Sequence, residues 1–201
     1  MATEDQRAPR RATLKRDTAE TSITVELCLD GRGEVAIETG LPFYDHMLHA
    51  LARHARFDLM LRCSGDLQVD DHHTVEDCAL ALGAALDQAL GERRGVARFG
   101  YAYAPLDDAL ARAVIDLSGR PHPVIDLGLV RERLGSVSCE MLGHALSSLA
   151  IAARATLHVD VLRGQNDHHR AEAAFKATAL ALRQAVARDG DPRVPSTKEA
   201  L

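Results

Sequence analysis

The chain has 201 residues, of which 46% are hydrophobic and 26% are charged, and its formal net charge at pH 7 is −5. This length and composition are ordinary for one substantial globular domain or two small ones. The acidic balance argues against a nucleic acid or an anionic membrane as a partner. No apolar run is long enough to span a bilayer, and no signal-peptide core follows Met1, so we expect a cytoplasmic protein.

The first half of the chain is predicted to form two strands, a helix, a third strand and a second helix. Residues 1–16 carry five Arg or Lys against two acidic residues, and we expect a flexible tail there. The strands at 22–31 and 34–40 are expected to pair as a hairpin across a Gly-containing turn. The apolar spacing then predicts a helix at 43–55, a strand at 57–65 and a helix at 73–90.

The second half repeats this order of elements. The expected elements are strands at 109–119 and 122–128, a helix at 139–153, a strand at 155–164 and a helix at 168–186. We therefore predict a duplicated β-β-α-β-α unit, with repeats at about 17–95 and about 96–190, inside one α+β domain over 17–201. The two halves can bury their apolar helix faces against each other, which places the helices between the sheets and leaves a C-terminal tail.

A His-His-x-x-Glu pattern opens the last helix of each repeat. Its residues are His72, His73 and Glu76 in the first repeat and His168, His169 and Glu172 in the second. Residues four apart lie on one face of a helix, so the first histidine and the glutamate of each pattern can reach one metal ion. The second histidine points roughly 100° away. We therefore expect an exchange between the halves, in which each repeat gives its second histidine to the ion of the other repeat.

Two further histidines, His46 and His144, stand in matching places and are expected to supply one more ligand to each ion. Spacing alone does not decide which histidine serves which ion. Three imidazoles and one carboxylate would leave two open positions on Mn, Fe or Co, whereas Zn is commonly satisfied by four ligands. Open positions are typical of catalytic sites. Asp71 and Asp167 precede the two patterns and suit two roles equally, as acceptors that orient the imidazoles or as helix N-caps.

Several long segments of this chain resemble the imidazoleglycerol-phosphate dehydratase family, from about Arg16 to Leu201. The segments are RDTAETSITVELCLDG, GLPFYDHMLHAL, DDHHTVEDCALALGAAL, RFGYAYAPLDDALARAVIDLSGRP, GQNDHHRAEAAFKA and PSTKEAL. The resemblance implies a duplicated α+β fold, two Mn²⁺ ions per site and a homo-oligomer of about 24 subunits. It also places His144 with the ion of the first pattern and His46 with the ion of the second.

The same resemblance implies an activity in histidine biosynthesis. The family removes water from D-erythro-imidazole-glycerol phosphate, which carries a dihydroxylated three-carbon chain on an imidazole ring, and yields imidazole-acetol phosphate. Glu20 matches the family's acid/base carboxylate. The positions that match substrate-binding positions of the family are Arg98, Arg120, Ser196 and Lys198 for the phosphate, and His49 and His54 for the pocket lining.

Two other classes of function also fit paired metal patterns. A di-metal hydrolase would use a metal-bridging hydroxide as the nucleophile, although such sites usually rely more on bridging carboxylates than on six imidazoles. A structural protein could instead use the metals only to hold its subunits together. That second class would have closed coordination and no affinity for a small ligand such as imidazole.

Overall fold

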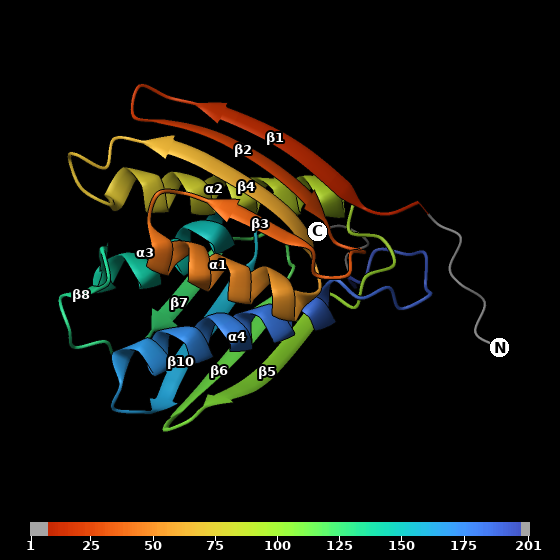
Figure 1. Cartoon of the computed structure of the whole chain (residues 1–201). Coiled ribbons are helices and arrows are strands. Elements are labelled where there is room, and N and C mark those ends of the chain that lie inside the picture. Colours follow the sequence, from red (N-terminus) through yellow and green to blue (C-terminus); the bar gives the residue numbers. More distant parts are fainter. Residues whose placement is uncertain (1–7, 198–201) are drawn as a thin grey trace.

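Two four-stranded sheets enclose four helices in the computed structural model, which describes residues 8–197 (Figure 1). The first half forms β1 (Arg11–Asp17), β2 (Thr21–Cys28), β3 (Val35–Glu38), α1 (Pro42–Ala55), β4 (Asp58–Gly65) and α2 (His72–Leu90). The second half forms β5 (Phe99–Leu106), β6 (Ala109–Asp116), β7 (His122–Asp126), the short pair β8 (Arg133–Leu134) and β9 (Val137–Ser138), α3 (Cys139–Ala152), β10 (Thr156–Arg163) and α4 (Asp167–Ala185). The predicted α+β fold with helices between the sheets is confirmed.

The duplication is visible in the order of the strands. The first sheet has the order β1-β2-β4-β3 and the second has the order β5-β6-β10-β7, so equivalent strands take equivalent places. Each repeat also holds one strand that the sequence reading missed, namely β1 or β5 at the sheet edge. Both the α2–α3 and the α1–α4 contacts join one repeat to the other, which makes the helix layer shared.

The hairpin expected for 22–31 and 34–40 is wrong. β2 pairs with β1 and with β4 in antiparallel fashion, and β3 pairs with β4 in parallel fashion. The reason lies in the loop between them, because the Asp58 side chain accepts hydrogen bonds from the backbone N–H groups of Arg32, Gly33 and Glu34. These hydrogen bonds hold the 32–34 loop at the first residue of β4. β3 therefore pairs with the edge of β4 opposite to the edge that pairs with β2.

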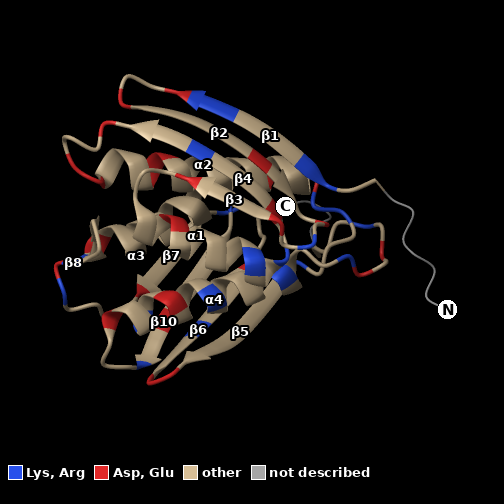
Figure 2. Cartoon of the chain, in the orientation of Figure 1, with Lys and Arg blue, Asp and Glu red and all other residues tan. Residues whose placement is uncertain are grey.

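The tail expected over residues 1–16 is also corrected, because Arg11–Asp17 is strand β1. Its side chains alternate, with Ala12 buried and the basic residues Arg11 and Lys15 exposed toward solvent. The basic residues at the two ends of this strand are blue in Figure 2. The density of charge suggested a tail, whereas the alternation of buried and exposed positions is the pattern of an edge strand.

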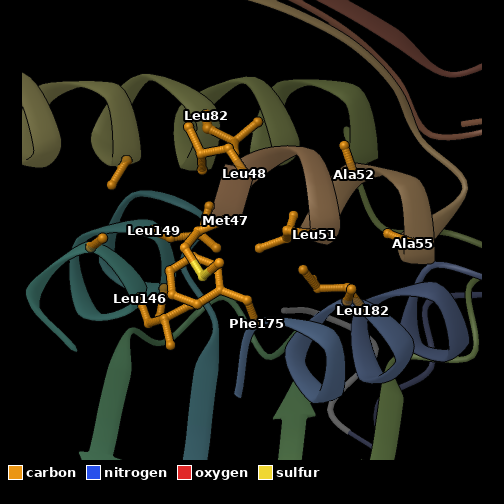
Figure 3. Close-up of a cluster of buried hydrophobic side chains, with 14 of the residues drawn as sticks. Met47, Leu48, Leu51, Ala52, Ala55, Leu82, Leu146, Leu149, Phe175 and Leu182 are labelled. Atoms are coloured by element: carbon orange, nitrogen blue, oxygen red, sulfur yellow. The ribbon is translucent and has the colours of Figure 1, made fainter. Parts of the chain in front are cut away.

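Mostly aliphatic side chains fill the space between the helices, as Figure 3 shows for Met47, Leu51, Phe175 and Leu182. α2 and α3 approach closely at Gly83, where an added Cβ atom would lie 2.5 Å from the backbone oxygen of Leu149. This packing fixes the histidines of α1 and α3 against the N-terminal turns of α4 and α2. None of the helices in residues 8–197 is long and apolar enough to cross a membrane.

Candidate metal centre

The first cluster of candidate ligands joins α1 to α4. Oε2 of Glu172 lies 3.1 Å from Nε2 of His46 and 3.2 Å from Nε2 of His168. One ligand atom from each of the three residues lies within 4.8 Å of the other two. Because His168 and Glu172 are four residues apart, one face of α4 carries both, and the α1–α4 contact brings His46 to them.

The second cluster joins α2 to α3 in the same way. Nε2 of His144 lies 2.8 Å from Oε1 of Glu76, and Nε2 of His72 lies 3.9 Å from Oε2 of that carboxylate. The imidazole rings of His72 and His144 have centroids 5.2 Å apart. The chain therefore pairs His144 with the first His-His-x-x-Glu pattern and His46 with the second, as the family resemblance implied and spacing could not decide.

His73 and His169 lie outside both clusters within the described part of the chain, so the expected exchange does not occur inside one subunit. Nδ1 of His73 lies 3.0 Å from Oδ2 of Asp66, and Nδ1 of His169 lies 2.6 Å from Oδ1 of Asp108. The physical reason is that α2 and α4 each lie on their own sheet. The second histidine therefore turns toward loops of its own repeat and not toward the opposite pair of helices.

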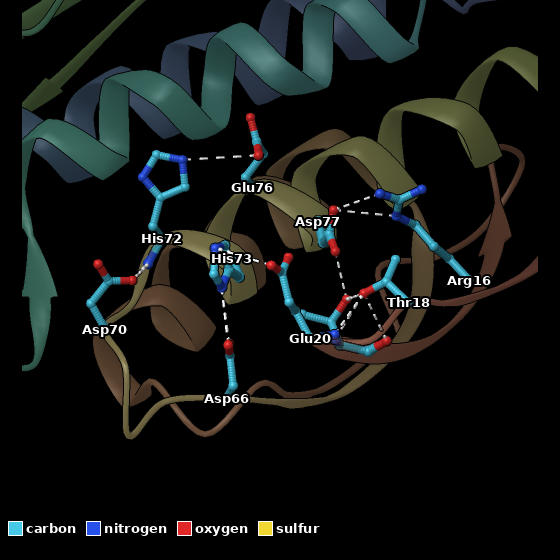
Figure 4. A network of polar contacts seen from close by, with 10 residues as sticks. Arg16, Thr18, Glu20, Asp66, Asp70, His72, His73, Glu76 and Asp77 are labelled. Carbon is cyan, nitrogen blue, oxygen red and sulfur yellow. Dashed lines mark hydrogen bonds and ion pairs between the residues drawn. The ribbon is translucent and has the colours of Figure 1, made fainter.

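Glu20 lies in the turn between β1 and β2, beside the start of α2 (Figure 4). Its Oε1 lies 3.6 Å from Nε2 of His73, and half of its side chain is exposed. The turn is anchored on α2, because the hydroxyl of Thr21 donates to Oδ2 of the buried Asp77 at 2.6 Å. Arg16 of β1 also donates to Asp77, one residue after Glu76. The structure thus holds Glu20 next to His73, the second histidine of the first pattern.

Asp71 and Asp167 serve neither of the two roles considered from the sequence. The Asp71 carboxylate accepts hydrogen bonds from the backbone N–H and the hydroxyl of Ser138, which precedes α3. The Asp167 carboxylate accepts from the backbone N–H groups of Val130 and Arg131. Both buried carboxylates therefore tie the start of a ligand-bearing helix to the 127–138 segment of the second half, and neither caps its own helix nor touches an imidazole.

The candidate phosphate residues are spread over the second half. Arg98 donates through Nε and Nη2 to both oxygens of Asp116 and through Nη1 to the backbone oxygen of Pro195. Arg98 and Ser196 line one cavity of about 860 Å³. Arg120 is exposed and donates to the backbone oxygen of Ser118. Lys198 falls outside the described residues.

Of the two histidines expected in the pocket, both lie exposed on α1, and His49 is three residues after His46. Burial and the nearby charge of Lys176 lower the pKa of His54. The sequence reading missed Lys176, whose ammonium lies 2.7 Å from Oε1 of Glu172. The available signal was its spacing, because Lys176 is four residues after Glu172 on the same helix.

The charges around the cluster of α1 and α4 favour an ionised Glu172. Burial acts to raise the pKa of Glu172, but hydrogen bonds from Lys176 and His46 outweigh it and lower that pKa to about 2. The hydrogen bond to Asp66 raises the pKa of His73. A carboxylate that stays ionised is able to hold a cation at neutral pH.

Each cluster fits a divalent first-row metal ion by the chemistry of its donors. Two imidazole nitrogens and one carboxylate oxygen converge in each, from one exposed histidine and two partly buried residues. Such a set suits Mn²⁺, Fe²⁺, Co²⁺ or Zn²⁺, and three protein donors leave further positions for other ligands. Nε2 of His73 lies 3.6 Å from Oε1 of Glu20, and Nε2 of His169 lies 3.7 Å from Oδ2 of Asp107.

A family model described as imidazoleglycerol-phosphate dehydratase matches residues 39–182. An imidazoleglycerol-phosphate dehydratase of Trichoderma harzianum is 56% identical over 199 residues, covering 87% of this chain and 95% of the relative. One of Phytophthora nicotianae is 59% identical over 96% of this chain, which spans 42% of that longer relative. The crystal structure of the Pyrococcus furiosus enzyme superimposes with a TM-score of 0.81 at 37% identity, covering 94% of this chain and 100% of that one.

Proposed function

The chain belongs to the imidazoleglycerol-phosphate dehydratase family, and from that premise we propose that it dehydrates D-erythro-imidazole-glycerol phosphate at a centre of two divalent metal ions. The products are imidazole-acetol phosphate and water, which makes the chain a hydro-lyase of histidine biosynthesis. The observation that carries the metal part of this proposal is the duplicated cluster of two imidazoles and one glutamate. We propose Mn²⁺ as the ion, because nitrogen and oxygen donors with several open positions suit it.

The two clusters would hold one ion each, and the second histidine of each pattern would complete the site of a neighbouring copy. His46, His168 and Glu172 would hold one ion, and His72, Glu76 and His144 would hold the other. The carboxylates at Nδ1 of His73 and His169 leave Nε2 as the donor atom of each ring. This arrangement supports a homo-oligomer, for which the family resemblance implies about 24 subunits.

When bound, such ions supply Lewis acidity that stabilises negative charge on an imidazole ring. The protein then has to move a proton from a carbon atom of the side chain, since loss of the neighbouring hydroxyl gives an enol that becomes the ketone. Glu20 suits that task, because its carboxylate lies at a solvent-accessible position 3.6 Å from Nε2 of His73. The hydrogen bonds of Thr18, Thr21 and Asp77 hold the turn that carries it.

Phosphate recognition is proposed for Arg98, Arg120, Ser196 and Lys198. A guanidinium has five N–H groups, and the bonds of Arg98 to Asp116 and Pro195 use three of them. The remaining two, one on each terminal nitrogen, suffice for a bidentate contact with two phosphate oxygens. Asp116 and the tail then act as supports that fix the plane of the guanidinium. His49 and His54 would line the pocket from the exposed face of α1.

The test compares turnover of the phosphorylated imidazole substrate by the wild type with turnover by Glu20→Gln, with metal content checked in both. Glutamine keeps the size of the side chain but has no basic oxygen. We expect unchanged metal content and a rate lower by about 10²–10⁴-fold at saturating substrate. Glu26→Gln, a substitution on the exposed face of β2, is the matched control and should retain the wild-type rate.

Two results would count against the proposal. A Glu20→Gln rate within about threefold of the wild type would remove this carboxylate from proton transfer. Full turnover by protein that a chelator has freed of all metal would refute the proposed metal centre. The assay should monitor the ketone and inorganic phosphate together, because release of phosphate without ketone would indicate a hydrolase.

A further inference from the structure

The second histidine of each His-His-x-x-Glu pattern, His73 or His169, has a carboxylate at one of its ring nitrogens. Nδ1 of His73 lies 3.0 and 3.2 Å from the two oxygens of Asp66, and Nδ1 of His169 lies 2.6 Å from Oδ1 of Asp108. At the opposite nitrogen, Nε2, the nearest carboxylates are farther away, with Glu20 at 3.6 Å and Asp107 at 3.7 Å. The same environment therefore surrounds a histidine in each half of the chain.

The two holding carboxylates come from different places in the duplicated unit. Asp66 is the residue directly after β4, and the residue directly after the equivalent strand β10 is Gly164, which has no side chain. Asp108 is the residue directly before β6, and the residue directly before the equivalent strand β2 is Glu20. The two halves thus reach the same contact at Nδ1 by different residues, which a simple inheritance from one ancestral contact does not explain.

We propose that Asp66 and Asp108 are positioning residues, which fix the tautomer and orientation of His73 and His169 so that Nε2 is the metal-binding atom of each. This inference rests on the proposed metal centre. A neutral imidazole carries a single N–H group, and an acceptor at Nδ1 keeps that N–H there. The lone pair of Nε2 is then available to an ion, and the ring cannot rotate without breaking the hydrogen bond.

Glu20 and Asp108 hold equivalent positions, directly before β2 and β6, but they have different contacts. Asp108 is occupied, because it accepts from the backbone N–H groups of Gln165 and Asn166 as well as from His169. In the first half, Asp66 already accepts the hydrogen bond from Nδ1 of His73. The Glu20 carboxylate is therefore not required for that contact. One of the two equivalent turn positions is therefore structural and the other is free to transfer a proton.

The experiment measures Mn²⁺ affinity by competition with a chelator in Asp66→Ala and Asp108→Ala. We expect each substitution to weaken binding at one of two sites by about 10- to 100-fold, the usual effect of removing a carboxylate that orients a ligating histidine. In Asp66→Asn, the amide oxygen can still accept from Nδ1–H of His73, so most of the affinity should return. Ring ¹⁵N shifts of the metal-free protein should place the histidine proton on Nδ1 in the wild type and largely on Nε2 in the alanine variants.

Asp58→Ala is the matched control, because Asp58 also ties a loop through three backbone N–H groups but contacts no histidine. It should lower stability and leave both Mn²⁺ affinities unchanged. Wild-type affinity in both alanine variants, or an Asp66→Asn variant as weak as Asp66→Ala, would overturn the positioning role while the metal centre stands. A wild-type protein that binds no Mn²⁺ would refute the metal centre itself, and the positioning role with it.

Discussion

Replacing Asp71 with alanine should loosen the junction between α2 and α3 and weaken one metal cluster only. The Asp71 side chain is buried and accepts from the backbone N–H of Ser138 at 2.5 Å and from its hydroxyl at 3.0 Å. A hydrogen bond to a charged group contributes about 1.5–3 kcal/mol, and water can replace part of the loss. We therefore expect Asp71→Ala to lower the free energy of unfolding by about 2–4 kcal/mol.

The consequence for the site follows from the position of Ser138, which directly precedes the helix that carries His144. If this tether sets the distance between His144 and Glu76, the variant should bind Mn²⁺ more weakly at that cluster and normally at the His46 cluster. Denaturant unfolding and metal titration measure the two effects. Asp70→Ala is the control, since Asp70 is exposed and, within residues 8–197, accepts from the backbone N–H of His72 alone, and should cost less than about 1 kcal/mol. A loss of stability in Asp71→Ala no larger than in this control would refute the reasoning.

Three more outcomes are expected. Arg120→Ala should raise the KM for the phosphorylated substrate about 10- to 100-fold without changing metal content, and an unchanged KM would exclude a phosphate contact. Removal of metal by a chelator should break the assembly into smaller species that Mn²⁺ restores, and an intact assembly in sedimentation after full metal removal would contradict this. Burial raises the pKa of Asp30, but hydrogen bonds from Arg10 and Arg188 outweigh it and hold that pKa well below its usual range. The stabilisation by Asp30 is therefore complete above about pH 4 and lost at lower pH, so Asp30→Asn should destabilise the protein more at pH 7 than at about pH 3, and an equal effect would contradict the linkage.

The duplicated histidine pattern carried most of what the sequence could predict. Helix periodicity placed α1, α2, α3 and α4 within one residue at every end, and the spacing of His168 and Glu172 gave the correct shared face. These features are local, so residues close in sequence determine them. The pairing of His46 with the second pattern is not local, because it depends on which helices cross, and the resemblance supplied it.

The errors share a physical cause, which is long-range bonding that leaves no periodic signal. The loop that separates β2 from β3 is shaped by Asp58, which follows it by more than twenty residues. The partner of Asp71 is Ser138, in the other half of the chain. Two adjacent histidines such as His72 and His73 must point in different directions. Which residue the second ring contacts depends on how the helix packs on its sheet, and the sequence pattern does not show this.

The amount of Mn²⁺ bound per chain tests the central claim most directly, namely that the duplication builds two equivalent metal clusters. The wild type should bind about two ions per chain, His72→Ala or His168→Ala about one, and the double variant almost none, with the fold retained by circular dichroism. A folded double variant that still binds about two ions per chain would contradict the assignment of both clusters.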